Sequence, residues 1–189
     1  MSVYLDNAAT TRPCEPAVSA VFQCMVEDYG NPSSLHKLGL VAEQRVEEAR
    51  KAIAAALVCD PRCITFTSGA TECNNTAIFG AAESYGRRKK KIIVSAIEHP
   101  SVSEPIKYLE EKKGFEVVRI KPSRNGEISE EDFIAAVDGD TFLVSCMLVN
   151  NETGSIQPVR KIFSYVKRNF PECITHCDAV QGFMKIPIR

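Results

Sequence analysis

Apolar positions along this chain follow two patterns that alternate from residue 64 onward. Helical spacing predicts helices at residues 16–29 (with Pro16 in the first turn), 39–57, 70–85, 101–113, 129–137 and 158–170. Short apolar or β-branched runs predict strands at residues 64–67, 92–96, 115–120, 141–149 and 174–177. Strands separated by helices form mostly parallel sheets with helices on both faces. The pattern therefore predicts an α/β fold of the αβα sandwich type.

The best candidate for a domain boundary lies near residue 36, before the first long helix. We therefore expect residues 1–36 to form an N-terminal segment and residues 37–189 to pack as one core. A chain of 189 residues is long enough for one domain with a full hydrophobic core. Residues 30–36, Gly-Asn-Pro-Ser-Ser-Leu-His, close the first segment. They contain more polar side chains than a simple linker needs.

Composition and charge narrow the function classes. The chain is 44% hydrophobic and 25% charged, with a net charge of -1. This net charge does not indicate binding to nucleic acid or to an acidic membrane surface. It has no apolar run of membrane-spanning length and no signal peptide at its start, so we expect a cytoplasmic protein. The basic run at 87–91 is predicted to be a solvated loop rather than a nucleic-acid site.

Eight cysteines invite a disulfide or zinc interpretation. The spacing Cys59-x-x-x-Cys63 and Cys173-x-x-x-Cys177 is looser than the usual zinc pairs, and Pro61 interrupts the first of them. We expect reduced thiols in the core and loops, and no metal site.

Residues 67–72, Thr-Ser-Gly-Ala-Thr-Glu, join a predicted strand to a predicted helix. A strand, a tight turn and a helix start direct free backbone N–H groups toward an anion. Gly69 allows close approach of a phosphate, and the hydroxyls of Ser68 and Thr71 add donors. An ordinary strand-to-helix turn explains the same residues equally well. The stretch is neither a Walker loop nor a Gly-x-Gly-x-x-Gly turn.

Three further predicted strands end in polar residues, and ligands of parallel sheets bind at that edge. These ends carry Glu98 and His99, Asn150 and Asn151, and Asp178 with Gln181; the strand at 115–120 ends in Lys-Pro-Ser and serves as a comparison. An imidazole, amides, a carboxylate and a phosphate-binding turn together suit pyridoxal phosphate, whose ring nitrogen needs an acidic partner. Taken singly, each residue also fits a strand end, a turn, a cap or a surface position.

Six segments, in order along nearly the whole chain, resemble the N-terminal half of cysteine desulfurases of the NifS/IscS kind. This group belongs to the class V aminotransferases, which are fold-type I pyridoxal-phosphate enzymes. The segments are YLDNAATT (4–11), GNPSSLH (30–36), TSGATECNN (67–75), EHPSV (98–102), VNNETG (149–154) and HCDAVQ (176–181).

The resemblance implies a role for each matching position. Ala70 and Thr71 would hold the phosphate of pyridoxal 5'-phosphate, and His99 would stack on the ring and act as the catalytic proton-transfer group. Asp178 would pair with the ring nitrogen, and Asn151 and Gln181 would contact the 3-oxygen. The substrate mouth would contain Asn7, Ala8, Asn31 and His36.

Enzymes of this kind take sulfur from L-cysteine, leave L-alanine, and pass a persulfide toward iron–sulfur clusters or tRNA thiolation. The resemblance thus implies a homodimer and a sulfur-acceptor or iron–sulfur scaffold protein as partner, without direct nucleic-acid or membrane binding. The family's Schiff-base lysine lies in a Ser-x-His-Lys segment that these 189 residues do not contain, and no cysteine here matches the persulfide cysteine. We therefore expect a truncated large domain that is inactive alone, and Lys185 is not assigned as the anchor.

Three alternatives stay open. Another class V enzyme, such as a selenocysteine lyase or an amino-acid:glyoxylate transaminase, would share the same cofactor residues. A non-catalytic binding or scaffold module would associate with its partner without cofactor. A nucleotide-binding α/β domain is the least supported, because no nucleotide phosphate motif is present.

Overall fold

The computed structural model describes residues 2–187, and the chain divides into two compact units, Met1–Phe66 and Thr67–Arg189. Each unit is described by itself. The expectation that residues 1–36 form a separate N-terminal segment, which contributes to the substrate mouth, stays a prediction.

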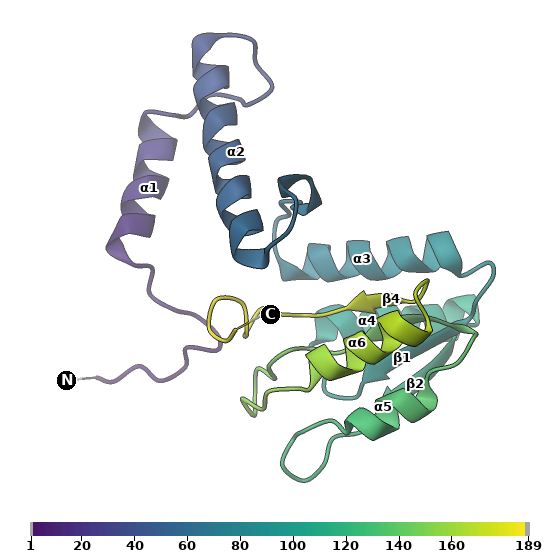
Figure 1. Ribbon diagram of the computed structural model, residues 1–189. Coiled ribbons are helices and arrows are strands. Elements are labelled where there is room, and N and C mark those ends of the chain that lie inside the picture. The colour runs from purple at the N-terminus through teal and green to yellow at the C-terminus, as the bar shows by residue number, and fades with distance from the viewer. Residues whose placement is uncertain (1, 188–189) are drawn as a thin grey trace. The chain divides into compact units, whose positions relative to one another are not determined.

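The first unit contains helices α1 (Glu15–Val26) and α2 (Lys37–Leu57) and the short 3-10 helix η1 (Pro61–Cys63) (Figure 1). Pro16 lies in the first turn of α1, as predicted, because its fixed φ suits that position. The Nδ1 atom of His36 accepts a hydrogen bond from the backbone N–H of Gly39 at 3.3 Å and so caps α2. The predicted helices at 16–29 and 39–57 are therefore present, with shifted ends.

The predicted strand at 64–67 is wrong. These residues form no ladder with any described strand. Instead, the Arg50 guanidinium donates a hydrogen bond to the carbonyl of Ile64 and lies 4.9 Å from the centroid of the Phe66 ring. A β-branched run favours an extended backbone, but it becomes a strand only when a partner strand lies beside it.

The second unit is built on a parallel four-stranded sheet. Its strands are β1 (Lys91–Ser95), β2 (Glu116–Ile120), β3 (Thr141–Ser145) and β4 (Ile174–His176), in the spatial order β2-β1-β3-β4. All three neighbouring pairs are parallel. The predicted α/β class and parallel sheet are confirmed.

Helices cover both faces of this sheet, as predicted. Helices α3 (Ala70–Tyr85) and α4 (Pro100–Lys113) pack on one face, and α5 (Glu130–Ala136) and α6 (Val159–Asn169) pack on the other (Figure 1). Because side chains alternate along a strand, Ile92 joins the first core with Ile78 and Ile106, whereas Ile93 joins the second with Phe133 and Ile162. This double burial explains why the strands read as continuous apolar runs.

The predicted cap and stop signals of the helices in this unit are also confirmed. Ser129 caps α5 by accepting the N–H of Asp132 at 3.0 Å, and Gly114 ends α4 with a left-handed φ of 68°. Both signals are local, so the sequence alone specifies them.

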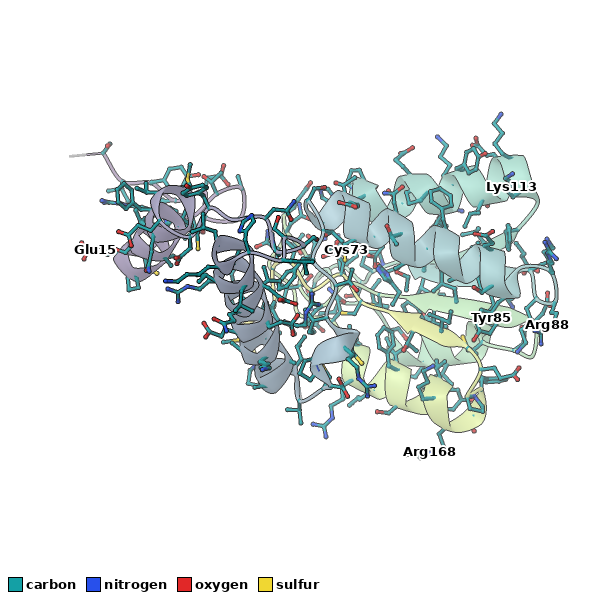
Figure 2. The ribbon with its side chains drawn as sticks, turned by 90° about the horizontal axis from the view of Figure 1, so that it is seen from above. Glu15, Cys73, Tyr85, Arg88, Lys113 and Arg168 are labelled. Atoms are coloured by element: carbon teal, nitrogen blue, oxygen red, sulfur yellow. The ribbon has the colours of Figure 1, made fainter. Side chains whose placement is uncertain are left out.

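The basic residues 87–90 lie in the connection between α3 and β1, and Lys91 is the first residue of β1. Figure 2 shows Arg88 near Tyr85, at the opposite end of α3 from Cys73. Lys89 pairs with Glu172 at 3.7 Å, and Lys91 pairs with Asp138 at 2.6 Å. No described helix is long and apolar enough to cross a membrane.

The chain reverses its direction of strand addition between β1 and β3, since β2 lies on one side of β1 and β3 lies on the other. In parallel sheets, such a reversal opens a crevice at the carboxyl ends of the two strands. The predicted strand at 141–149 is shorter in the structure and ends at Ser145. The backbone N–H of Met147 then donates to the Glu98 carboxyl group instead of a strand partner.

Candidate cofactor and active site

The N-terminus of α3 has an extended glycine in place of a capping side chain. Gly69 is the N-cap residue, with φ 163° and ψ 179°, and no side chain caps the helix. A Cβ added at Gly69 would meet nothing within 4 Å, so the helix start faces open space. The first N–H groups of a helix have no partner within the helix. Ala70 and Thr71 therefore present donors to an incoming anion.

Ser68 is engaged elsewhere. Its backbone N–H and its hydroxyl both donate to Oε2 of Glu72, at 2.7 and 2.6 Å. These hydrogen bonds lower the pKa of Glu72, which lies in the first turn of α3. The expected Ser68 hydroxyl donor is thus directed to Glu72, and Ala70 and Thr71 keep the predicted anion-binding position.

His99 lies between two cavities at the carboxyl end of β1. It lines a cavity of about 470 Å³ together with Glu98, Asn150 and Asn151. It also lines a cavity of about 490 Å³ together with Thr71. The structure thus brings His99 to the same cavities as two other predicted cofactor residues.

The His99 imidazole also caps α4. Its Nδ1 accepts the backbone N–H of Ser101 at 3.1 Å and lies 2.8 Å from the Ser101 hydroxyl oxygen. A ring nitrogen that accepts a hydrogen bond carries no proton, so the proton of the neutral imidazole lies on Nε2. The capping interpretation and the functional one are therefore compatible, because capping uses only one ring nitrogen.

Asn150 and Asn151 play different parts in the loop after β3. The side chain of Asn150 is buried: its Nδ2 donates to the carbonyl of Ile97 at 3.0 Å, and its Oδ1 accepts the backbone N–H groups of Glu152 and Thr153. Asn150 thus builds the turn that the sequence suggested. Asn151, half-buried, lines the cavity beside His99.

Asp178 is buried at the end of β4, where each carboxylate oxygen accepts one hydrogen bond. Oδ1 accepts the N–H of Val180 at 3.0 Å, and Oδ2 accepts the side-chain amide of Asn74 at 2.9 Å. The first is the local cap expected from sequence, and the second joins residues 104 positions apart. A carboxylate held at both oxygens cannot turn away from the sheet edge.

Asn74 connects Asp178 to His99. Its amide nitrogen also donates to the hydroxyl of Ser101 at 2.9 Å, and that hydroxyl reaches Nδ1 of His99. Since the carboxylate can only accept, the orientation of the Asn74 amide is fixed and its oxygen is left as an acceptor. Asp178, Asn74, Ser101 and His99 form one continuous hydrogen-bonded line, which we call the Asn74 network.

His176 supports this network from the end of β4. Its Nε2 lies 3.2 Å from the Asn74 amide oxygen, and its Nδ1 lies 2.8 Å from the hydroxyl of Ser145. Burial lowers the pKa of His176, although the nearby Asp178 opposes that effect. The imidazole is therefore a neutral donor to Asn74. Sequence reasoning missed Asn74, Ser101 and His176, because their roles depend on contacts between distant segments.

Glu98 bridges the ends of β1 and β3. Its Oε1 accepts the Ser95 hydroxyl and the backbone N–H of Met147, the latter at 2.7 Å. Its Oε2 is buried and has no hydrogen-bond partner among the described residues. Burial raises the pKa of Glu98 to about 7. The sequence placed Glu98 at a strand end but assigned it no role.

Gln181 follows Asp178 in the same turn, and its Oε1 accepts a hydrogen bond from the Lys185 ammonium group at 3.1 Å. The expected substrate-mouth residues belong to the first unit, where Asn7 and Ala8 are exposed and Asn31 Oδ1 accepts the N–H of Ser33 at 2.9 Å. With His36 capping α2, all four have defined local positions, and their place at a substrate mouth stays a prediction.

The thiols are reduced. Cys173 is buried and Cys177 is half-buried, and burial raises their pKa values to about 11 and about 12. Cys59 and Cys63 are exposed in the first unit. Within residues 2–187, no group of three His, Cys, Asp or Glu side chains has the arrangement of a metal site.

The second unit has the donors and acceptors that pyridoxal phosphate requires. The uncapped start of α3 suits its phosphate, and the buried Asp178 carboxylate suits its ring nitrogen. His99 and Asn151 line one cavity near these groups. We call Ala70, Thr71, His99, Asn151, Asp178 and Gln181 the cofactor wall.

Related proteins share both sequence and fold with this chain. A NifS/IcsS protein homolog of Lactobacillus delbrueckii subsp. bulgaricus is 44% identical over 183 residues, which are 97% of this chain and 47% of that protein. Cysteine desulfurase IscS of Shewanella baltica is 45% identical over 192 residues, covering 100% of this chain and 46% of that protein. The chain thus spans about half the length of the curated relatives it matches.

Solved structures give the same picture. A structure titled NIFS-LIKE PROTEIN superposes with a TM-score of 0.92 at 42% identity, over 96% of this chain and 49% of that one. A structure titled "SspA in complex with cysteine" superposes with a TM-score of 0.90 at 34% identity, over 96% of this chain and 52% of that one. Residues 3–189 match the family described as "Aminotransferase class-V". Sequence, fold and family match agree: the chain belongs to the class V aminotransferases.

Proposed function

We propose that this chain forms the pyridoxal-phosphate-binding part of a cysteine desulfurase. The observation that carries the proposal is the Asn74 network, which ties a buried carboxylate, Asp178, to an imidazole, His99, at the carboxyl edge of a parallel sheet. A carboxylate for the ring nitrogen and an imidazole for the ring face are what this cofactor needs from the protein.

Each residue of the cofactor wall has a role in this proposal. Ala70 and Thr71 bind the phosphate through the start of α3, and Asp178 keeps the ring nitrogen protonated. When bound, pyridoxal phosphate supplies an electron sink for bonds at the substrate α-carbon. Asn151 and Gln181 hold the 3-oxygen of the ring.

His99 is the proposed proton-transfer residue. Its Nδ1 is held by Ser101, so Nε2 is the ring nitrogen proposed to transfer the proton. A general acid or base must be held within hydrogen-bond reach of the proton that it transfers. The cap of α4 thus orients the imidazole for proton transfer while it stabilises the helix.

L-Cysteine is the proposed substrate, with L-alanine as the product and sulfur passed on to an acceptor. The names of the relatives and the cysteine complex of SspA support cysteine. Asn7, Ala8, Asn31 and His36 are proposed to line the substrate mouth. A sulfur-acceptor or iron–sulfur scaffold partner, a homodimer and a cytoplasmic location belong to the same proposal.

The test is an absorbance titration of the purified chain with pyridoxal phosphate, followed by borohydride reduction and intact-mass measurement. A perturbed cofactor spectrum without a mass gain supports a wall that binds the cofactor non-covalently. A stoichiometric gain that maps to Lys185 would place the covalent anchor within this chain. An unchanged spectrum up to millimolar cofactor would contradict the proposal and favour a cofactor-independent scaffold module.

Substrate choice is tested separately, in a preparation of the protein that is catalytically active. Release of alanine from cysteine supports a desulfurase. Release of alanine from selenocysteine but not from cysteine, or transfer of an amino group to glyoxylate, would instead assign the chain to another class V activity. Because these activities share the cofactor wall, the binding titration is not affected by the outcome.

A further inference from the structure

Glu98 is a half-buried acid with one satisfied oxygen and one buried, unsatisfied oxygen. Oε1 accepts from the Ser95 hydroxyl and from the backbone N–H of Met147, whereas Oε2 is buried and has no partner among the described residues. Buried polar atoms nearly always have a hydrogen-bond partner, so an exception requires an explanation. The proposed roles of the cofactor wall do not use this residue.

The two hydrogen bonds of Glu98 join two strands at the crevice. Ser95 ends β1 and Met147 follows β3, and these strands separate where the sheet order reverses. His99 is the next residue after Glu98, and Asn151 lies in the loop that begins at Met147. The Glu98 bridge, defined as Ser95–Glu98–Met147, therefore fixes the spacing of two segments of the cofactor wall.

We propose that Glu98 is a positioning residue, which holds His99 and Asn151 at a fixed separation through the Glu98 bridge. The effect on cofactor binding that tests this proposal rests on the proposed function. The geometry that carries it is one oxygen, Oε1, which accepts hydrogen bonds from donors at the ends of two strands.

The surroundings of Glu98 shift its pKa in two opposite directions. The titratable groups that face it are Cys146, after β3, and Cys177 and Asp178, after β4. Burial is the main cause of its raised pKa of about 7, and Asp178 raises it further. The two bridge hydrogen bonds act in the opposite direction and lower this pKa, because a charged oxygen accepts a hydrogen bond more strongly than a neutral one. The bridge is therefore expected in both ionisation states of Glu98.

A direct readout of the bridge is the backbone amide of Met147. In a ¹⁵N-labelled chain without cofactor, its resonance should titrate with a midpoint near pH 7, because this N–H donates to Glu98. In Glu98→Gln the titration should disappear, since the amide side chain is neutral at every pH. A Met147 resonance that is unchanged from pH 6 to pH 8.5 in the wild type would overturn the Glu98 bridge.

The functional readout is the affinity for pyridoxal phosphate across the same pH range. Both ionisation states of Glu98 accept the two bridge hydrogen bonds, as does the amide oxygen of Glu98→Gln, so the affinities of the two proteins should stay within about twofold of each other at each pH. The ratio of the two proteins at each pH removes the ionisation of the cofactor itself. Glu83→Gln, on the exposed side of α3, is the matched control and should follow the wild type.

Glu98→Leu tests positioning without charge. It removes both carboxyl oxygens of Glu98 and puts an apolar side chain of similar size in their place. It should lower cofactor affinity at pH 6, where Glu98→Gln binds as the wild type does. Equal affinity of the Leu and Gln variants would overturn the positioning role. If no variant binds the cofactor, the proposed function fails, and the Met147 titration still decides whether the bridge exists.

Discussion

The carboxyl ends of β1, β3 and β4 differ from the carboxyl end of β2. The first three are linked by contacts that reach across the sequence: the Glu98 carboxyl group accepts the backbone N–H of Met147, and the Asn74 side chain joins Asp178 to Ser101. At the end of β2, Pro122 bridges to Ile128, and the N–H of Ser123 donates to the carbonyl of Glu127 at 2.8 Å. The distant side chains of Ser155 and Gln157 also bind backbone groups of this turn.

This difference teaches where a site can form in a parallel sheet. At the end of β2, the distant side chains of Ser155 and Gln157 bind backbone groups of residues 126–128, so they fix a turn and not a polar side chain. The ends of β1, β3 and β4 depend on buried polar side chains, each of which must find a partner in another segment. Polar groups held in this way are preorganised for a ligand, and the predictions below test that contrast.

The largest expected effect is that of Asp178→Asn. The substitution keeps the shape of the side chain but removes the negative charge proposed to hold the ring nitrogen. A hydrogen bond to a charged group contributes up to about 3 kcal/mol, so the affinity for pyridoxal phosphate should fall by about 100-fold. Equilibrium titration by cofactor absorbance measures it.

The control for this prediction is Asp132→Asn, an exposed aspartate in the first turn of α5. It carries the same chemical change away from the three linked strand ends and should leave the affinity unchanged. If Asp178→Asn also binds like the wild type, the end of β4 does not contact the cofactor ring.

The second effect is that of Asn74→Leu, which removes the link between Asp178 and His99. It leaves buried groups of Asp178, Ser101 and His176 without their partner, at a cost of about 2 kcal/mol in the free energy of unfolding. Because Asp178 is then less well held, cofactor affinity should fall by about tenfold. Urea denaturation and the absorbance titration measure the two quantities.

Asn169→Leu is the matched control, since Asn169 ends α6 and donates only to the carbonyl of Tyr165 in its own helix. It should change neither quantity appreciably. An Asn74→Leu chain that is destabilised but binds cofactor normally would show that the Asn74 network stabilises the fold without orienting Asp178.

The third effect is a pH dependence of stability that Glu98 causes. Its pKa is raised from 4.5 in the unfolded chain to about 7 in the folded one, so the folded state binds the extra proton between these values. The stabilising contribution is complete below pH 4.5 and is lost as the pH rises through 7, with a slope of about 1.4 kcal/mol per unit.

Urea denaturation of the wild type and Glu98→Gln at several pH values from 5 to 8.5 isolates this contribution. The difference in free energy of unfolding between the two proteins should decrease up to about pH 7 and then stay constant. Parallel curves over the whole range would mean that Glu98 titrates as an ordinary exposed acid.

The sequence predicted the elements of the second unit better than those of the first. The strands β1 and β2 are apolar runs with side chains in the hydrophobic cores on both faces of the sheet. Their local pattern therefore agrees with their tertiary packing. The run at 64–67 has the same β-branched character but no partner strand, and pairing is a tertiary property.

The candidate site divides in the same way. His99, Asn151 and Asp178 lie in the loops that follow β1, β3 and β4, so their place at the sheet edge could be predicted from strand order alone. Asn74 lies inside a helix, where nothing local distinguishes it from Asn75. Only the fold shows that its amide reaches Asp178, 104 residues later in the chain.

The smallest expected effect is at the end of β2, with Lys121→Ala and Ser123→Ala. Both side chains line a cavity of about 680 Å³ beside α5, at the one strand end that carries no predicted cofactor residue. Surface substitutions of this kind change free energies by about 0.5 kcal/mol or less, so cofactor affinity should stay within about twofold of the wild type. A tenfold loss in either variant would mean that the site extends across all four strand ends, and the contrast between β2 and the other strands would no longer locate it.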